Sequence, residues 1–267
     1  MEVYSIMCRL GFISSKKKVQ IGPLIEGATK YYGRVNRDGI GFSFIEDGGI
    51  KTIKSPEQAS KFWSKNSDKT SLISNAAIFH VRYASVGSVC AVNTHPISNK
   101  QFALAHNGTL HNWQGAKKLL QKRGYKFETS VDSEVLLAAW TIYRESFLEF
   151  LKDQGVRGWY TILILSKDGK IRAVTNSGYL VVFRRDNDSI GFSDSAFKNL
   201  RNKYKIELNV LYTFKNGRLA KREKLNGWDV NSEIPRTKSK YDDDDEEDSE
   251  FWSWLHNIKG SSKTKYI

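Results

Sequence analysis

The sequence predicts an α+β fold in which stacked β-sheets lie between outer layers of helices. Three observations support this class. Short apolar or alternating runs, which are typical of strands, occur in two groups along the chain. Helical patterns separate the groups, and the longest of them, over residues 132–151, repeats its apolar positions at helical spacing. Sheets and helices with one apolar face each bury that face by packing in layers.

The first group of elements is expected to contain five strands and two helices. Its strands are 7–14, 40–45, 50–53, 76–83 and 102–106. Pro23 favours a helix that reaches about Tyr32, because proline suits a first helical turn. Ser55 is the expected N-cap of a second, short helix. The last strand is expected to end in a turn at Asn107-Gly108.

The second group combines helices with further strands. One helix is expected from Trp113 to Lys122, with Gly124 stopping it. A longer helix should run from Asp132 to about Leu151, and a short one should lie near 195–201. The strands of this group are 158–165, 171–175, 179–185, 188–193 and 208–214, with a hairpin at Asn216-Gly217.

The net charge of +13 is unevenly distributed over the 267 residues. Residues 1–227 carry 36 basic and 19 acidic side chains, a balance of +17, whereas residues 228–267 carry 6 and 10, a balance of −4. A basic body favours anionic partners. However, no basic stretch interleaves with aromatic residues in the manner of a nucleic-acid motif. A solvated basic face is therefore the preferred interpretation, and nucleic acid is not an expected partner.

The sequence gives no sign of a membrane or secreted protein. No run approaches the ~18 apolar residues that cross a bilayer, and the N-terminus lacks the apolar core of a signal peptide. The two cysteines, Cys8 and Cys90, provide neither a disulfide framework nor the thiols of a zinc ribbon. We therefore expect a cytoplasmic protein.

The last forty residues, 228–267, are expected to be a disordered tail. Eight of the nine positions 242–250 are acidic, and such a run cannot pack into a core. The aromatic segment 251–255 follows directly. An acidic run before aromatic residues resembles a docking peptide. Alternatively, the aromatic side chains cover a patch of the body, and the sequence leaves both possibilities open.

Cys8 is the centre of the chemical hypothesis. It lies in an apolar stretch near the start of the chain, where a thiol is a poor core residue because chain ends fray. If residues 1–7 are a removable leader, or if synthesis starts at Met7, Cys8 becomes the first residue. Its α-amine, with a reference pKa of about 7.7–8.0, then lies beside the thiol and can act as its base. The alternative is a small apolar residue in a first strand.

Three more segments carry polar residues that suit a catalytic site: 80–87, 105–108 and 131–134. Each has a simple structural explanation. Arg82 could form an ion pair, Asn107-Gly108 could be an ordinary turn, and Asp132 could N-cap the long helix. None of these segments, taken alone, indicates a particular chemistry.

Taken together and in order, the Cys8 stretch and these three segments resemble class II glutamine amidotransferase domains, which are N-terminal-nucleophile hydrolases. The segments Asp38-Gly39-Ile40-Gly41 and Asn93-Thr94-His95-Pro96 are similar to the stand-alone branch whose chains begin Met-Cys-Arg. The resemblance covers roughly residues 7–215. Two departures exist: relatives often carry an aromatic residue where this chain has Ile40, which would alter the pocket lining, and six residues precede Met7.

The resemblance implies a four-layer αββα sandwich over residues 8–227, with the nucleophile at the start of a central strand. It implies that Cys8 is the nucleophile and that Asn107 and Gly108 form the oxyanion hole. It implies that Arg82 binds the substrate α-carboxylate and that Asp132 binds the substrate α-ammonium group. Ser85, in the same segment as Arg82, is a third expected substrate-binding residue. The chemistry needs no metal or other cofactor, so His80, His95 and His106 would be structural or would orient the pocket.

Physical chemistry supports these residue types. Glutamine carries two opposite charges at one end, and an arginine fork suits bidentate carboxylate binding. Attack on the amide creates an oxyanion, which needs preorganised donors worth ~3–4 kcal/mol each. The resulting hypothesis is hydrolysis of a γ-glutamyl amide, either by a glutaminase that passes ammonia to a separate synthase subunit or by a hydrolase of a larger γ-glutamyl compound. The alternative is a catalytically silent binding protein that keeps its leader and docks partners through the basic body and the acidic-aromatic tail.

Deletion of residues 231–267 should leave the hydrolysis of free glutamine within about twofold of the full chain, because every matched motif lies upstream. The charge of the tail should act instead on association, over roughly the ~10 Å Debye length at 0.1 M salt. Steady-state kinetics and sedimentation of both chains at two salt concentrations test this. A truncated chain that folds but is inactive would place part of the active site in the tail.

Overall fold

The structure is a computed structural model, and it describes residues 8–84, 87–178, 180–185, 188–193 and 203–230. Four expectations from the sequence lie outside these residues: the leader, Ser85, the short helix near 195–201 and the acidic-aromatic segment. In the described part, no helix is both long enough and apolar enough to cross a membrane.

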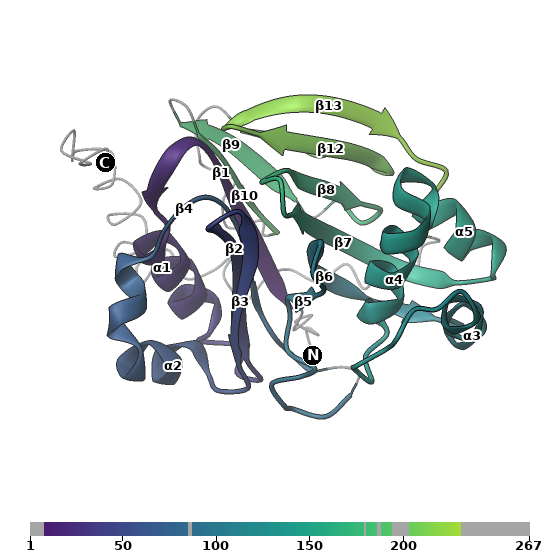
Figure 1. The fold of residues 1–267 in the computed structure, drawn as a ribbon, viewed down its shortest axis with the longest axis horizontal. Helices are drawn as coiled ribbons and strands as arrows, with labels where there is room; N and C mark the ends of the chain where they lie inside the picture. The colour runs from purple at the N-terminus through teal and green to yellow at the C-terminus, as the bar shows by residue number, and fades with distance from the viewer. Residues whose placement is uncertain (1–7, 85–86, 179, 186–187, 194–202, 231–267) are drawn as a thin grey trace, which may run out of the picture.

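Two antiparallel sheets form the centre of the molecule (Figure 1). The first has the order β11-β9-β10-β1-β4-β2-β3, and the second has the order β13-β12-β8-β7-β6-β5. The strands of the first are β1 (Arg9–Gln20), β2 (Ile40–Glu46), β3 (Gly49–Ser55), β4 (Ile73–Val81), β9 (Val181–Arg185), β10 (Asp188–Phe192) and β11 (Lys203–Lys205). Those of the second are β5 (Ile97–Ser98), β6 (Phe102–His111), β7 (Arg157–Ser166), β8 (Ile171–Thr175), β12 (Val210–Lys215) and β13 (Arg218–Lys224).

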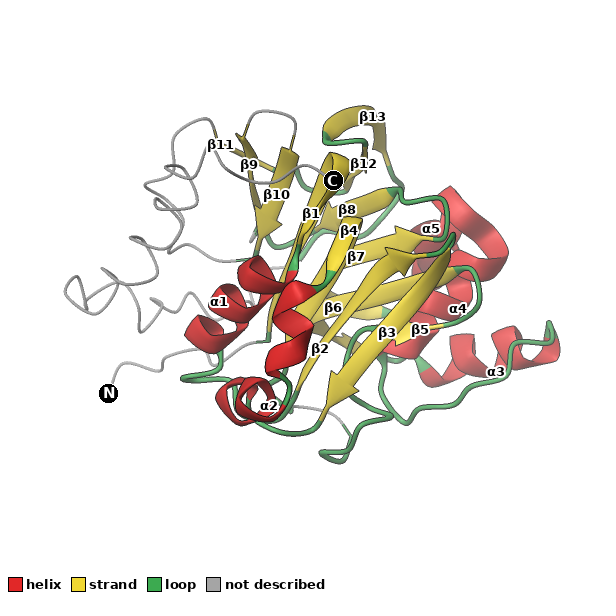
Figure 2. Cartoon of the chain, turned by 60° about the vertical axis from the view of Figure 1, so that its left-hand side comes forward, coloured by secondary structure: helices red, strands yellow, loops and turns green. Residues whose placement is uncertain are grey.

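Helices cover the outer face of each sheet (Figure 2). The first sheet carries α1 (Gly22–Tyr32), α2 (Ala59–Lys65) and the 3-10 turn η1 (Ser67–Ser71). The second carries α3 (Gln114–Lys122), α4 (Ser133–Tyr143), the turn η2 (Arg144–Ser146) and α5 (Phe147–Asp153). The expected four-layer αββα architecture is therefore confirmed, with β1 in the middle of its sheet.

The apolar residues divide into three clusters that match the three interfaces between these layers. Between the sheets, Leu10 and Phe12 of β1 meet small residues of β6, Ala103 and Ala105. The alternation of strand side chains sends Ile13 to the opposite face, beneath α1 and α2. Small residues opposite large ones let the two sheets approach closely, so that the start of β1 lies against β6.

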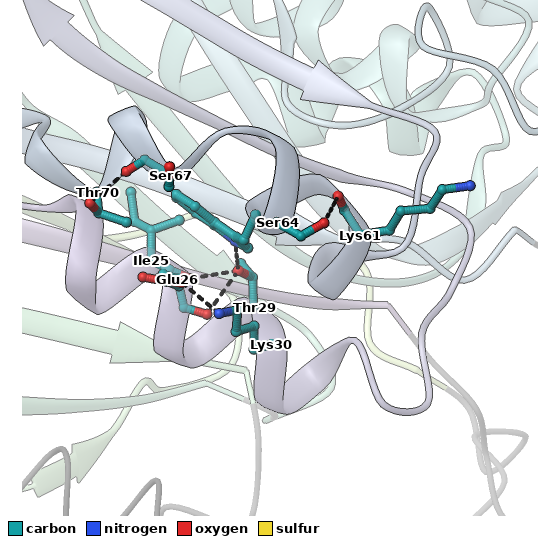
Figure 3. Close-up of polar contacts among 9 residues, drawn as sticks. Ile25, Glu26, Thr29, Lys30, Lys61, Ser64, Ser67 and Thr70 are labelled. Carbon is teal, nitrogen blue, oxygen red and sulfur yellow. Dashed lines mark hydrogen bonds and ion pairs between the residues drawn. The ribbon is translucent and has the colours of Figure 1, made fainter.

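A buried polar contact joins α1 to α2. The indole N–H of Trp63 donates to the hydroxyl of Thr29 at 2.9 Å, and that hydroxyl in turn donates to the carbonyl of Ile25 at 2.6 Å. Figure 3 shows Thr29 with its neighbours on α1, including Lys30, whose ammonium group pairs with Glu26. Because Trp63 is fully packed beneath these helices, its N–H needs such an acceptor.

The expected helix over 132–151 is divided in two. Arg144 adopts a φ of +53°, which ends α4, and its guanidinium donates to the carbonyls of Trp140 and Thr141 at 2.8 and 2.6 Å. These bonds satisfy carbonyl groups that a helix end leaves without partners. The apolar periodicity continues through the break, because α5 packs its own apolar residues in the same cluster.

Two smaller features also differ from the expectations. The second helix starts at Ala59 rather than at Ser55, whose hydroxyl accepts from the Glu57 N–H in a local turn. Strand β11 was not expected from the sequence. Near the end of the described residues, Trp228 is buried against Tyr160 and donates to the carbonyl of Gly158 at 2.7 Å.

Candidate active site

Cys8 directly precedes β1, at the end of the central strand of its sheet. The register of β1 with β4 pairs Arg9 with Val81, so Cys8 lies beside the residues that follow β4. Its sulfur is 3.2 Å from the carbonyl oxygen of Tyr83, to which it donates, and 3.3 Å from the Tyr83 N–H, from which it accepts. Among the described residues, no imidazole or carboxylate is hydrogen-bonded to this sulfur.

The surroundings of Cys8 oppose ionisation of its thiol. Burial raises the pKa of Cys8 to about 11, against the lowering effects of the Tyr83 hydrogen bond and of the positive charges of Arg82 and Arg9. The negative charge of Asp132 raises it further. Arg82 and Asp132 therefore both lie within electrostatic reach of the Cys8 thiol, although the three residues come from distant segments of the chain. The thiol also needs a base before it can attack a substrate.

Arg82 lies just past the end of β4 and is buried, with 3% of its surface exposed. Its backbone continues the ladder, since the Arg82 N–H donates to the Gly39 carbonyl at 2.8 Å. Its guanidinium donates to the carbonyl oxygens of Ser88 at 2.9 Å and Gly87 at 3.3 Å. The Arg82 guanidinium is planar and offers five N–H groups in all. The two hydrogen bonds to these carbonyls set its orientation.

Asp132 is the residue before α4, but its side chain does not cap that helix. One carboxylate oxygen accepts from the Leu110 N–H on β6 at 2.7 Å, and the other accepts from the Ser133 hydroxyl at 3.3 Å. The residue is 4% exposed. The simple explanation as a helix cap is therefore wrong, and the carboxylate instead ties the start of α4 to β6.

Asn107 and Gly108 lie inside β6, and the turn expected there is not formed. Asn107 pairs with Thr161 and Gly108 with Tyr160 on β7, and the ladder continues to His111. The sequence pattern favoured a turn because Asn-Gly is a common turn dipeptide. Gly108 has a φ of +154°, and a Cβ there would collide with the Trp159 carbonyl and the His106 ring. Only glycine fits this position.

The side chain of Asn107 is 1% exposed, and its oxygen is buried without a hydrogen-bond partner in the described residues. A buried amide group left in this way is unusual in a folded protein. Strand alternation places Asn107 on the same face of β6 as Ala103 and Ala105, which is the face turned to β1. The Asn107 side-chain amide therefore lies on the face of this sheet that is turned to β1, the strand that Cys8 precedes.

Three histidines, His80, His95 and His106, form a buried cluster next to these residues. The rings of His80 and His95 are joined by a 3.3 Å contact between nitrogens, and the centroids of His95 and His106 are 6.4 Å apart. His106 also contacts the hydroxyl of Ser133 at 2.8 Å. In the part of the chain that the structure describes, no group of three His, Cys, Asp or Glu side chains is arranged to hold a metal ion.

Burial holds all three imidazoles in their neutral form. It lowers the pKa of His80 to about 3, helped by the charges of His106 and Arg82. It lowers the pKa of His95 well below the ordinary value, helped by the charges of His80 and His106. It also lowers the pKa of His106, against the opposing effect of the Asp132 carboxylate.

The two segments that marked the stand-alone branch lie against each other. A Cβ on Gly39 would lie 2.9 Å from the hydroxyl oxygen of Thr94, and one on Gly41 would collide with the His95 carbonyl. Gly39, just before β2, and Gly41, within it, thus leave space for the 93–96 segment. Ile40, between them, points into the core beneath α1 and α2 and is fully buried there. The expectation that Ile40 alters the pocket lining is therefore wrong.

Sequence reasoning did not assign roles to Tyr83, Asn93 or Ser130. The structure places Tyr83 in contact with Cys8, whereas Asn93 contacts Ser88 and Ser130. Asn93 was visible as part of a motif, but its contacts depend on the fold. Cys90 lies in the same loop and contacts the Ser88 hydroxyl at 3.5 Å. Ser85 lies outside the described residues.

The fold and these residues together define a protein of the class that the sequence resembles. The family model of class-II glutamine amidotransferases matches residues 7–145, about half of the chain, and the chain belongs to this family. The match begins one residue before Cys8 and ends just past α4, so it contains every described residue of the candidate site.

Individual relatives are similar to parts of the chain. An amidophosphoribosyltransferase of Pyrococcus horikoshii is 30% identical over 178 residues, which cover 61% of this chain and 39% of that protein. A glutamine–fructose-6-phosphate aminotransferase (isomerizing) of Fusobacterium nucleatum is 32% identical over 168 residues, covering 61% of this chain and 27% of that protein. The chain thus matches less than half the length of these relatives.

Solved structures share the fold. The glutamine phosphoribosylpyrophosphate amidotransferase from B. subtilis, complexed with ADP and GMP, aligns with a TM-score of 0.66 and 21% identity, covering 81% of this chain and 49% of that one. A glutamine aminotransferase class-II domain protein from Silicibacter pomeroyi aligns with a TM-score of 0.57 and 13% identity. In that case the alignment covers 82% of this chain and 99% of that one.

The free energy of unfolding should fall as the pH is lowered from 7 to 5. Because burial lowers the pKa of His80 to about 3 and that of His95 well below the ordinary value, these two imidazoles stay neutral in the fold, and only the unfolded chain takes up their protons below its pKa of about 6.5. The contribution of the neutral histidines to the free energy of unfolding is fully present above that pKa. Below it, the contribution is lost by about 1 kcal/mol per pH unit for each histidine. Urea titrations at several pH values measure the slope.

The matched comparison is His80→Gln against His111→Gln, since His111 is exposed at the end of β6. The His80 variant should show a shallower dependence of stability on pH, and the His111 variant should follow the wild type. A wild-type unfolding free energy that is flat between pH 7 and 5 would contradict the assignment of neutral histidines.

Proposed function

We propose that this chain hydrolyses the side-chain amide of glutamine or of another γ-glutamyl compound, with Cys8 as the nucleophile. The observation that carries the proposal is the convergence of three groups. A thiol, a buried guanidinium and a buried carboxylate lie within electrostatic reach, at the start of a central strand. The two opposite charges suit the α-carboxylate and α-ammonium groups of an amino acid, and the thiol suits the amide.

In the proposed reaction, Arg82 binds the substrate carboxylate and Asp132 binds the substrate ammonium group. The Cys8 sulfur attacks the amide carbon, and the resulting oxyanion is stabilised by the Asn107 side-chain amide and the Gly108 N–H. Expulsion of ammonia, or of an amine, leaves a thioester on Cys8. Water then cleaves this thioester, which releases glutamate and restores the thiol.

The base in this scheme is the α-amine of Cys8 itself, so we place the active form in a chain that begins at Cys8. Two observations support this choice. The thiol pKa is raised to about 11, and no described side chain is bonded to the sulfur as a base. An amine with a reference pKa of about 7.7–8.0 is largely available near neutral pH. We accordingly propose that residues 1–7 are absent from the active enzyme.

We propose a separate acceptor for the ammonia, such as a synthase subunit. The names of relatives that this chain matches include a transferase activity, which supports an acceptor for the nitrogen. The competing proposal, a silent binding protein, applies to a chain that keeps residues 1–7, because its thiol then lacks a base. Intact mass separates the two: active protein should begin at Cys8.

Cys8→Ala should reduce glutamate release from glutamine by about a thousandfold or more, because no other group can form the thioester. Cys90→Ala is the control and should keep the wild-type rate. Glutamate is measured by a coupled assay, with all variants produced as chains that begin at residue 8. Turnover by Cys8→Ala at the wild-type rate would rule out the proposed nucleophile.

Arg82→Lys should raise the KM for glutamine by about ten- to a hundredfold, with a smaller change in kcat. The arginine presents two parallel N–H donors to the substrate carboxylate, whereas lysine presents a point charge. Charged hydrogen bonds of this kind are worth about 1.5–3 kcal/mol. Asp132→Asn should act similarly through the substrate ammonium group. Arg37→Lys, at an exposed position, serves as the control. Unchanged KM in both variants would mean that the amino-acid end is bound elsewhere.

A further inference from the structure

We propose that Asn93 is a positioning residue that sets the spacing between Arg82 and Asp132, and hence the fit of the site to an α-amino acid. This inference rests on the proposed function, in which those two residues hold the charged groups of the substrate. It concerns a residue that contacts neither the reacting amide nor, in the proposed scheme, the substrate itself.

The first step concerns what holds Arg82. Its guanidinium donates to the carbonyl oxygens of Ser88 and Gly87, at 2.9 and 3.3 Å. The direction of the guanidinium therefore depends on where these two carbonyls lie. Because the residue is buried, loss of either acceptor would leave charged N–H groups poorly satisfied and would favour a different side-chain position.

The second step concerns what holds those carbonyls. The side-chain N–H₂ group of Asn93 is 3.2 Å from the Ser88 carbonyl oxygen and 3.3 Å from the Ser88 hydroxyl. The Gly87 backbone is packed against the same amide, since a Cβ there would lie 3.1 Å from the Asn93 nitrogen and 3.0 Å from Val131. Asn93 is 2% exposed. Its side-chain amide thus holds the two residues, Gly87 and Ser88, whose carbonyls accept from Arg82.

The third step links Asn93 to Asp132. The Asn93 side-chain oxygen accepts from the Ser130 N–H at 3.2 Å and contacts the Ser130 hydroxyl at 3.3 Å, and the Asn93 nitrogen is 3.1 Å from that hydroxyl. Ser130 lies two residues before Asp132. One amide therefore joins the segment that holds Arg82 to the segment that carries Asp132.

The Asp132 side of this bridge is itself rigid. The carboxylate of Glu134, in the first turn of α4, accepts from the backbone N–H groups of Glu128, at 2.9 and 3.2 Å, and Thr129, at 2.7 Å. These bonds fix the two residues before Ser130. Asn93 consequently spans two anchored segments, and an asparagine suits this place because one end of its amide donates and the other accepts.

Asn93→Ala should raise the KM for glutamine and the inhibition constant of glutamate together, by about tenfold, since loss of a buried bridge is worth about 1.4 kcal/mol or more. The rate at which iodoacetamide alkylates Cys8 should change less than twofold, because this probe has no amino-acid end to be positioned. The parallel loss in substrate and product binding, with unchanged thiol reactivity, distinguishes positioning from general damage.

Asn99→Ala is the matched control. Asn99 lies in the same connection and also bridges two segments, since it donates to the Thr141 hydroxyl at 3.0 Å and accepts from the Gln101 and Phe102 N–H groups at 2.9 Å. Its side-chain hydrogen bonds to Thr141, Gln101 and Phe102, all within the described part of the chain, do not reach the segments of Arg82 or Asp132. Its variant should keep the wild-type KM and inhibition constant even if its melting temperature falls.

Ser130→Ala provides a second, milder break, because it removes the hydroxyl contacts and keeps the Ser130 N–H bond to Asn93. Its KM should rise about threefold. The inference is overturned if Asn93→Ala and Ser130→Ala bind glutamine and glutamate as Asn99→Ala does. It is also overturned if Asn93→Ala does not fold and Ser130→Ala has a wild-type KM. A wild type that releases no glutamate would instead overturn the proposed function.

Discussion

The structure depends on the requirement that two buried, oppositely charged groups keep their hydrogen bonds. A guanidinium and a carboxylate removed from water cost several kcal/mol each unless backbone or side-chain partners replace the solvent. Arg82 meets this requirement with carbonyls of the following loop, and Asp132 meets it with a backbone N–H of β6. Each bond ties a loop to a sheet. The same contacts that make the charges tolerable therefore also hold them at one place beside Cys8.

The layered fold supplies the frame for this arrangement. The two sheets approach through small and large apolar residues in alternation, and the start of β1 in one sheet comes close to β6 in the other. His80 shares the β4 face of Ala76 and Ile78, which is turned to the second sheet, and His95 links it to His106 on the helix-covered face of β6. Their neutral rings continue the packing of the core without adding a positive charge next to Arg82. The site thus begins where the apolar interface ends.

Local patterns in the sequence were sufficient to predict stacked sheets with helices outside. The central strand after Cys8 and the assignment of Arg82, Asn107, Gly108 and Asp132 to one site came from the family resemblance. Local patterns failed where long-range contacts overrule local preference. Asn-Gly usually turns, yet pairing with β7 keeps Asn107-Gly108 extended within a strand. Asp before a helix usually caps it, yet the Leu110 N–H captures the Asp132 carboxylate. The bridge made by Asn93 was not predictable, because its partners are residues 88 and 130, which only the folded chain brings together.

The ends of the two sheets show a further use of the excess positive charge. Each open sheet has edge strands whose unpaired backbone groups can recruit a strand from another molecule. Among the described residues, the edge strands are β3, β11, β13 and β5. All lysines and arginines of β11 and β13 are exposed, β3 carries the exposed Lys51 and the half-buried Lys54, and β5 is only two residues long. Incoming strands of a second copy would meet like charges at three edges and too little backbone at the fourth. The basic surface therefore protects this protein against edge-to-edge aggregation.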